Sequence, residues 1–168
     1  MTLARAQPLP AAARRRLTGA GLLLGIGFGG FVDGIVLHQI LQWHHMLTST
    51  GAHPATTVAG LETNTLWDGL FHAFAWVASL AGLLLLWSAM RDGLRPSASR
   101  LIGLLLAGWG AFNLVEGIVD HHILTIHHVK AGEHQLAFDL GFLGLGAALA
   151  LAGYLLMRRA GREEAKTG

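Results

Sequence analysis

Four apolar segments, each about as long as a helix that crosses a lipid bilayer, constrain the fold of this chain more than any other feature. They run from about Leu17 to Leu37, Leu66 to Met90, Leu101 to Val119 and Leu136 to Met157. A membrane-spanning helix needs about 20 apolar residues. The 168-residue chain is 52% hydrophobic and only 13% charged, far from the soluble average. The sequence therefore predicts an all-α fold, a bundle of four transmembrane helices.

The apolar segments are expected to form two helical hairpins within a single integral membrane domain, residues 1–168. The first repeat spans about 17–90, the second about 101–157, and residues 158–168 form a polar cytoplasmic tail. A basic cluster precedes the first segment, as in a signal peptide. The apolar run that follows is about 20 residues long and has no small-residue cleavage site, so we expect it to be kept as a membrane helix.

The basic residues predict the orientation of these helices. All of them except Lys130 lie on one side of the predicted membrane, namely Arg5, Arg14, Arg15, Arg16, Arg91, Arg95, Arg100, Arg158, Arg159, Arg162 and Lys166. Cytoplasmic loops carry the excess of Lys and Arg, so both termini are expected in the cytoplasm of a bacterial inner membrane. The pI near 9.7 reflects these anchors. The expected partner is the bilayer and not nucleic acid, and a homo-oligomer is left open.

One polar motif occurs twice along the chain. The segment FVDGIVLHQILQWHHM begins at Phe31, and LVEGIVDHHILTIHHV begins at Leu114, 83 residues later. Both copies carry a carboxylate, a glycine and three histidines at matching positions near the end of an apolar segment. Ionisable side chains are expensive inside a membrane and usually functional. The repetition therefore indicates an internal duplication whose copies are related by an axis along the membrane normal.

An α-helical projection of the motif places its polar groups on one half of the helix. At about 100° per residue, His38 shares a stripe with His45, and Asp33 shares the neighbouring stripe with His44. The second copy repeats this pattern, and Val36 and Ile40 belong to the opposite, lipid-facing side. The motif ends of the helices are expected to face outward.

A His/carboxylate transition-metal site is the function that these residues favour. Imidazole suits zinc, copper and iron, and carboxylates serve as ligands or orient the histidines. The expected inner ligands are His38, His45, His72, His121 and His128. Further candidates are Asp33, Glu116, Asp68, Asp120, His44, His122 and His127. Copper, iron and zinc are not distinguished. The absence of cysteine excludes thiolate sites, iron–sulfur clusters and covalent c-type haem.

Several alternatives remain open at this point. His38 and His121 lie at matched depth, as the axial ligands of a haem b between two helices would. The paired histidines also suggest a membrane di-metal oxidase or hydroxylase, a metal-dependent oxidoreductase. A buried hydrogen-bonded network or a proton-handling chain needs no metal at all.

The paired motifs, from Gly34 to Met46 and from Val115 to Val129, resemble those of a family of small bacterial four-helix membrane proteins that is defined as a domain of unknown function. The likeness covers most of the chain. It implies a four-helix integral membrane protein. It also implies components of respiratory oxidase assembly as partners, and with them respiratory copper or haem as the cofactor. It implies no particular reaction. The family signature corresponds to Asp33, Gly34, His38, His44, His45, Glu116, Gly117, His121, His122, His127 and His128.

Overall fold

The computed structural model describes residues 11–167, and within this range the chain is helical without a β-strand. The elements are α1 (Ala11–Val32), η1 (Asp33–Ile40), α2 (Val58–Arg91), α3 (Ala98–Glu116), η2 (Gly117–Ile123) and α4 (Gln135–Thr167). Four long helices result, each apolar and long enough to cross a membrane. The all-α prediction is confirmed. Arg5, expected to anchor the N-terminal side, lies outside the described residues.

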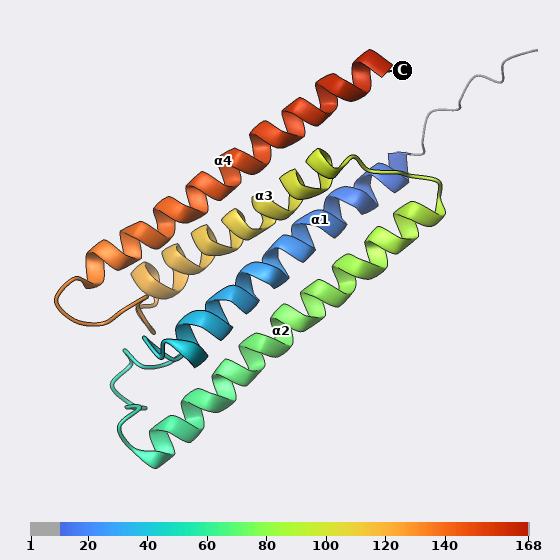
Figure 1. The fold of residues 1–168 in the computed structure, drawn as a ribbon. Coiled ribbons are helices and arrows are strands. Elements are labelled where there is room, and N and C mark those ends of the chain that lie inside the picture. The colour runs from blue at the N-terminus through green and yellow to red at the C-terminus, as the bar shows by residue number, and fades with distance from the viewer. Residues whose placement is uncertain (1–10, 168) are drawn as a thin grey trace, which may run out of the picture.

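The four helices stand side by side in one row (Figure 1). α1 packs on α2 and on α3, and α3 packs on α4, whereas no other pair of long helices within residues 11–167 is in contact. The row is thus open and does not close into a four-membered ring. Large apolar side chains such as Trp76 and Leu151, both 58% exposed, cover its outer surface, as lipid contact requires.

Glycines set the contact between the two central helices. A Cβ atom on Gly25 would lie 2.1 Å from the carbonyl oxygen of Leu105, and one on Gly108 would lie 2.3 Å from that of Leu22. These two contacts correspond at the 83-residue offset of the motif. Membrane helices associate through close packing, and small residues allow their backbones to touch. The α1–α3 contact therefore depends on the lack of side chains at both positions.

Both motif copies leave the α-helical conformation within one residue of the same repeat position, and both π-helical segments end at corresponding isoleucines, Ile40 and Ile123. η1 and η2 are π-helices, and each ends in hydrogen bonds that recur 83 residues apart: Leu41 N to Val36 O and Leu124 N to Val119 O, at 2.8 and 2.7 Å. The residue that follows has a positive φ in both copies, 48° at Gln42 and 49° at Thr125. This φ is uncommon outside glycine, and π-helical segments are frequent at functional sites. The chain then turns back across the helix ends.

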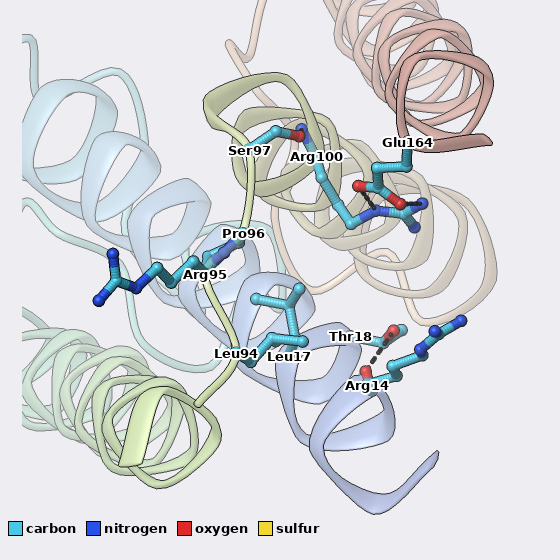
Figure 2. A pocket seen from close by; sticks show the side chains of 9 residues that line it. All are labelled: Arg14, Leu17, Thr18, Leu94, Arg95, Pro96, Ser97, Arg100 and Glu164. Atoms are coloured by element: carbon cyan, nitrogen blue, oxygen red, sulfur yellow. Dashed lines mark hydrogen bonds and ion pairs between the residues drawn. The ribbon is translucent and has the colours of Figure 1, made fainter. Parts of the chain in front are cut away.

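The motif copies lie together at one end of the row, called here the histidine end (residues 33–46 and 116–129). The loops that join η1 to α2 and η2 to α4 lie at the same end (Figure 1). The opposite, arginine end carries charged pairs, Arg16 with Asp92 and Arg100 with Glu164. A cavity of about 400 Å³ lies there. Figure 2 shows the side chains that line it, with Arg95 pointing away from Arg100. The charges of the arginine end are thus largely paired or solvated.

Alanine at Gly108 is expected to destabilise the protein by roughly 1–3 kcal/mol, because the new methyl group would clash with the backbone of α1. Thermal unfolding in detergent measures the effect. Alanine at Gly69 is the matched control, since a Cβ there meets nothing within 4 Å. Equal melting temperatures for the two variants would contradict this account of the α1–α3 contact.

Candidate metal centre

Four histidine side chains form the core of the histidine end. His38, His44, His121 and His127 are between 0 and 3% exposed. The rings of His44 and His127 stack with their centroids 4.7 Å apart and their planes inclined by 4°. The centroid of His38 lies 4.2 Å from that of His44, and the centroid of His121 lies 4.9 Å from that of His127. The two copies therefore contribute one pair of histidines each to a single buried cluster.

Nδ1 of His44 and Nδ1 of His127 are each held by a backbone carbonyl oxygen of the other motif copy. Nδ1 of His44 lies 2.8 Å from the carbonyl oxygen of Val129, and Nδ1 of His127 lies 3.1 Å from that of Met46. The two copies thus exchange corresponding bonds. Because a carbonyl oxygen only accepts, Nδ1 carries the proton in both rings. The lone pair of a neutral ring is then on Nε2, which is the usual arrangement in a metal-binding histidine.

Two aspartates from the flanking helices hold both motif copies in place. Asp68 of α2 accepts from Nδ1 of His38 at 2.9 Å, from Nδ1 of His45 at 2.6 Å and from the amide of Met46 at 2.9 Å. Asp139 of α4 repeats this pattern: it accepts from Nδ1 of His128 at 2.8 Å and from the amide of Val129 at 3.0 Å, and Nδ1 of His121 lies 3.4 Å away. These carboxylates orient the cluster from outside.

The inner atoms of the cluster, in contrast, lack hydrogen-bond partners. Among the described residues, the buried and unpartnered atoms are Oδ2 of Asp33, Oε2 of Glu116, both ring nitrogens of His121 and Nε2 of His38, His44 and His127. Nδ1 of His121 is the one member of this group that lies toward a flanking helix, 3.4 Å from Asp139. Oδ2 of Asp33 lies 3.1 Å from Nε2 of His38, and Oε1 of Glu116 lies 3.6 Å from Nε2 of His127. Leaving such groups buried and unmatched costs about 1–3 kcal/mol each.

The same atoms satisfy the spacing of a metal site. The ligand atoms of His38, His44 and His127 lie within 4.8 Å of one another, and so do those of Glu116, His121 and His127. All five side chains are buried. Imidazole nitrogens and carboxylate oxygens that converge at this distance suit zinc, iron or copper(II).

The surroundings keep the two stacked histidines neutral. Both rings belong to the segments that follow η1 and η2, beyond the helical spans. Burial lowers the pKa of His44 from 6.5 to about 4, and the nearby His38 lowers this pKa further. Burial, together with His44 and His121, lowers the pKa of His127 well below its ordinary value. Both rings are therefore free of an extra proton at neutral pH and available as ligands.

The α-helical projection of the motif is wrong beyond Asp33, because the chain becomes π-helical there and ends its helix before His44. His44, and not His45, lies against His38. His45 and His128 are about 15% exposed, and their Nδ1 atoms bind Asp68 and Asp139 beside the cluster.

The remaining predicted ligands lie outside the two ligand groups. Nδ1 of His72 bonds to the carbonyl oxygen of Asp68, and the ring packs against the bare backbone of Gly34. His122 is exposed, and Asp120 is half-buried. Asp139 had not been predicted as a site residue. Two signals in the sequence mark it. Asp139 begins the fourth apolar segment at the depth of the other carboxylates, and Phe138-Asp139 matches Trp67-Asp68 at an offset of 71, because the second loop is shorter.

Apolar grooves approach the cluster from the lipid-facing sides. One groove of about 390 Å³ includes Asp33 together with Trp109 and Phe142. Another, of about 350 Å³, includes Glu116 and Asp120 together with Phe71. Each carboxylate of the cluster thus lies at the edge of an apolar groove.

A family model described as "Predicted membrane protein (DUF2243)" matches residues 20–160, and the chain belongs to this family. The match confirms the predicted membership of a family of membrane proteins of unknown function. No curated protein matches the chain. No solved structure matches it either.

The metal-free protein is expected to lose stability as the pH falls from about 6.5 to about 4. His44 has a pKa near 4 in the folded protein and near 6.5 when unfolded, so the unfolded chain binds the additional proton first. The loss from this group is on the order of 3 kcal/mol. Melting temperatures in detergent across this range measure it.

The control for this pH effect is His44→Asn. The asparagine amide can still donate to the carbonyl oxygen of Val129 but does not titrate. The variant should show a weaker pH dependence than the wild type. An equal dependence in both proteins would show that another group is responsible.

Proposed function

We propose that this member of the membrane-protein family binds a divalent transition metal through the buried cluster of His38, His44, His121, His127, Asp33 and Glu116. The observation that carries the proposal is the difference between the two sides of the cluster. Nδ1 of His38, His44 and His127 is held by Asp68 or by a backbone carbonyl, and Nδ1 of His121 lies 3.4 Å from Asp139. The Nε2 atoms of the four rings and one oxygen each of Asp33 and Glu116 have no hydrogen-bond partner. Metal binding would give these Nε2 atoms and carboxylate oxygens the partner that they lack.

A purely structural polar network is the weaker explanation of the cluster. Buried polar groups in native proteins are hydrogen-bonded in the great majority of cases. Here the unpartnered atoms number seven among the described residues, and all of them belong to the one cluster. A network kept only for packing would be expected to form well-aligned hydrogen bonds, whereas here even Oδ2 of Asp33 and Nε2 of His38, 3.1 Å apart, form none.

Haem and proton transport fit the geometry less well. The stacked rings of His44 and His127 neighbour both His38 and His121, and thus fill the space that a porphyrin between these two would need. A proton path would need polar groups along the membrane. Between Asn113 and the arginine end, Ser79 is the one buried polar side chain among the described residues, so such a path is not continuous.

The donor set indicates which metals to test first. The cluster offers imidazole and carboxylate and neither thiolate nor thioether, which favours iron, zinc or copper(II) over copper(I). Met46 takes part through its carbonyl oxygen, which binds His127. Iron or copper would give the protein a redox role in the membrane.

The site is placed on the outer side of a bacterial inner membrane in this proposal. The arginines of the described chain gather at the end opposite the histidine cluster, and the positive-inside rule assigns that end to the cytoplasm. Lys130, at the histidine end, lies over the rings of Trp43 and Phe138. The metal would then be exchanged with the periplasm.

Protein purified in detergent without a His tag or added metal is expected to contain stoichiometric metal by elemental mass spectrometry. The double variant His38→Asn, His121→Asn should lose it, because both Nε2 ligands are gone. His122→Asn is the matched control, since the exposed His122 lies outside both ligand groups. A wild type that lacks metal and takes up no iron, zinc or copper on titration would overturn the proposal. A Soret band would instead establish haem.

The orientation is tested with single cysteines, since the chain has none of its own. In intact spheroplasts, Ser49→Cys in the loop at the histidine end should react with a membrane-impermeant maleimide. Ala98→Cys at the arginine end should react only after lysis. Both positions are exposed. The reverse pattern would place the cluster on the cytoplasmic side.

A further inference from the structure

We propose that the histidine cluster is a dinuclear centre that holds two metal ions side by side, one in each copy of the motif. This inference rests on the proposed function and adds the number of ions and their ligands. It starts from the fact that the two groups of converging ligand atoms both contain His127. The question is whether both groups can be filled at once.

His127 can serve one ion only. A neutral imidazole has one lone pair, here on Nε2, because Nδ1 bonds to the carbonyl oxygen of Met46. If His127 binds together with Glu116 and His121, an ion at His38 and His44 needs another donor. We assign this role to Oδ2 of Asp33, which lies outside the two 4.8 Å groups but is buried, has no hydrogen-bond partner and lies 3.1 Å from Nε2 of His38.

Two equivalent ligand sets follow from this assignment. Set A is Asp33, His38 and His44, and set B is Glu116, His121 and His127, each 83 residues further along. Each set combines two imidazoles with one carboxylate and leaves coordination positions open, a combination known from non-haem iron and catalytic zinc sites. The equivalence reproduces the duplication of the sequence.

The distances between the rings describe two sets that adjoin each other. Within a set the ring centroids are 4.2 Å apart for His38 and His44 and 4.9 Å apart for His121 and His127. Across the sets, His38 lies 5.8 Å from His127, and His44 lies 6.4 Å from His121. The stacked pair His44–His127 connects the sets at 4.7 Å. The contact across the stacked pair is about as close as those within the sets, so two ions would occupy adjoining positions that meet at His44 and His127.

The buried charges also match two ions. Four carboxylates are buried among the described residues, namely Asp33, Asp68, Glu116 and Asp139. All four belong to the cluster or bind its histidines. In the metal-loaded form, with the ligand histidines neutral and the four carboxylates ionised, two divalent cations would balance this charge, whereas one would leave two negative charges to be neutralised by protons. Uncompensated charge in a buried site is strongly unfavourable.

Copper(II) provides the test, because it binds nitrogen and oxygen sites more tightly than other divalent metals of its series. Metal-free protein is loaded with copper(II), weakly held ions are removed with excess glycine, and the remaining copper is counted. The wild type should keep two ions per chain, with an electron paramagnetic resonance spectrum broadened or silenced by coupling between them. His134→Asn, at an exposed histidine away from the cluster, should behave identically.

Variants of one set at a time distinguish the two positions. Asp33→Asn with His38→Asn should remove the ion of set A, and Glu116→Gln with His121→Asn should remove that of set B. Each variant should keep one ion, with the uncoupled spectrum of isolated copper(II). His44→Asn, which preserves the donor to Val129, should also lose a single ion.

The possible results separate this inference from the proposed function. One ion in the wild type and none in either double variant would establish a single shared site, and would overturn the dinuclear centre while leaving metal binding intact. A wild type that keeps no copper and binds neither iron nor zinc would overturn both. If the double variants fail to give a single peak in gel filtration, the count and coupling in the wild type and in His44→Asn decide the matter.

Discussion

The backbones of α1 and α3 meet at Gly25 and Gly108, where neither helix has a side chain to hold the other away. Inside a membrane the hydrophobic effect provides no force between apolar helices, so close packing of this kind determines which helices associate and in what register. Because the two glycines occupy matching places in the two repeats, the contact brings both motif copies to the same end of the row and to the same depth. The stacked rings of His44 and His127 lie where the two copies meet, and the rest of the cluster is arranged around them.

The flanking helices contribute through their aspartates rather than through further apolar contact. Asp68 and Asp139 each accept hydrogen bonds from a motif amide and from a histidine after the helix end, and each lies beside the histidine of the π-helix. They thereby fix the segments that follow η1 and η2, where no regular helix would hold them. The carboxylates also set the direction of the rings, because an acceptor on Nδ1 leaves Nε2 facing inward. The polarity of the cluster, satisfied outside and unsatisfied inside, follows from this arrangement and is the physical basis of the metal proposal.

Much of this architecture was predictable from particular residues. The four segments are long and apolar enough to cross a membrane. A helix satisfies its own backbone hydrogen bonds in lipid, so such segments are expected to be helical. The duplicated carboxylate, glycine and histidines identified the end of the fold where the buried polar groups gather, and Gly34 does allow a close neighbour, His72. The pairing of histidines was not predictable in the same way. An α-helical projection assumes a uniform turn, and the π-helical segments and the positive φ of Gln42 and Thr125 rotate every side chain that follows.

The sequence alone, then, established the helical membrane fold, the internal repeat and the inventory of polar groups, because composition and spacing are local properties. The folded chain assigned each group its place. His44 and His127 enter the cluster through hydrogen bonds to Val129 and Met46, residues more than 80 positions away. His45 and His128 point instead to the aspartates of the flanking helices, and Asp139 takes the role of Asp68 although the shorter loop removes it from the common register. Such contacts join segments distant in the chain, so no local pattern encodes them; they arise when α1 and α3 come together and both helices end in the same turn.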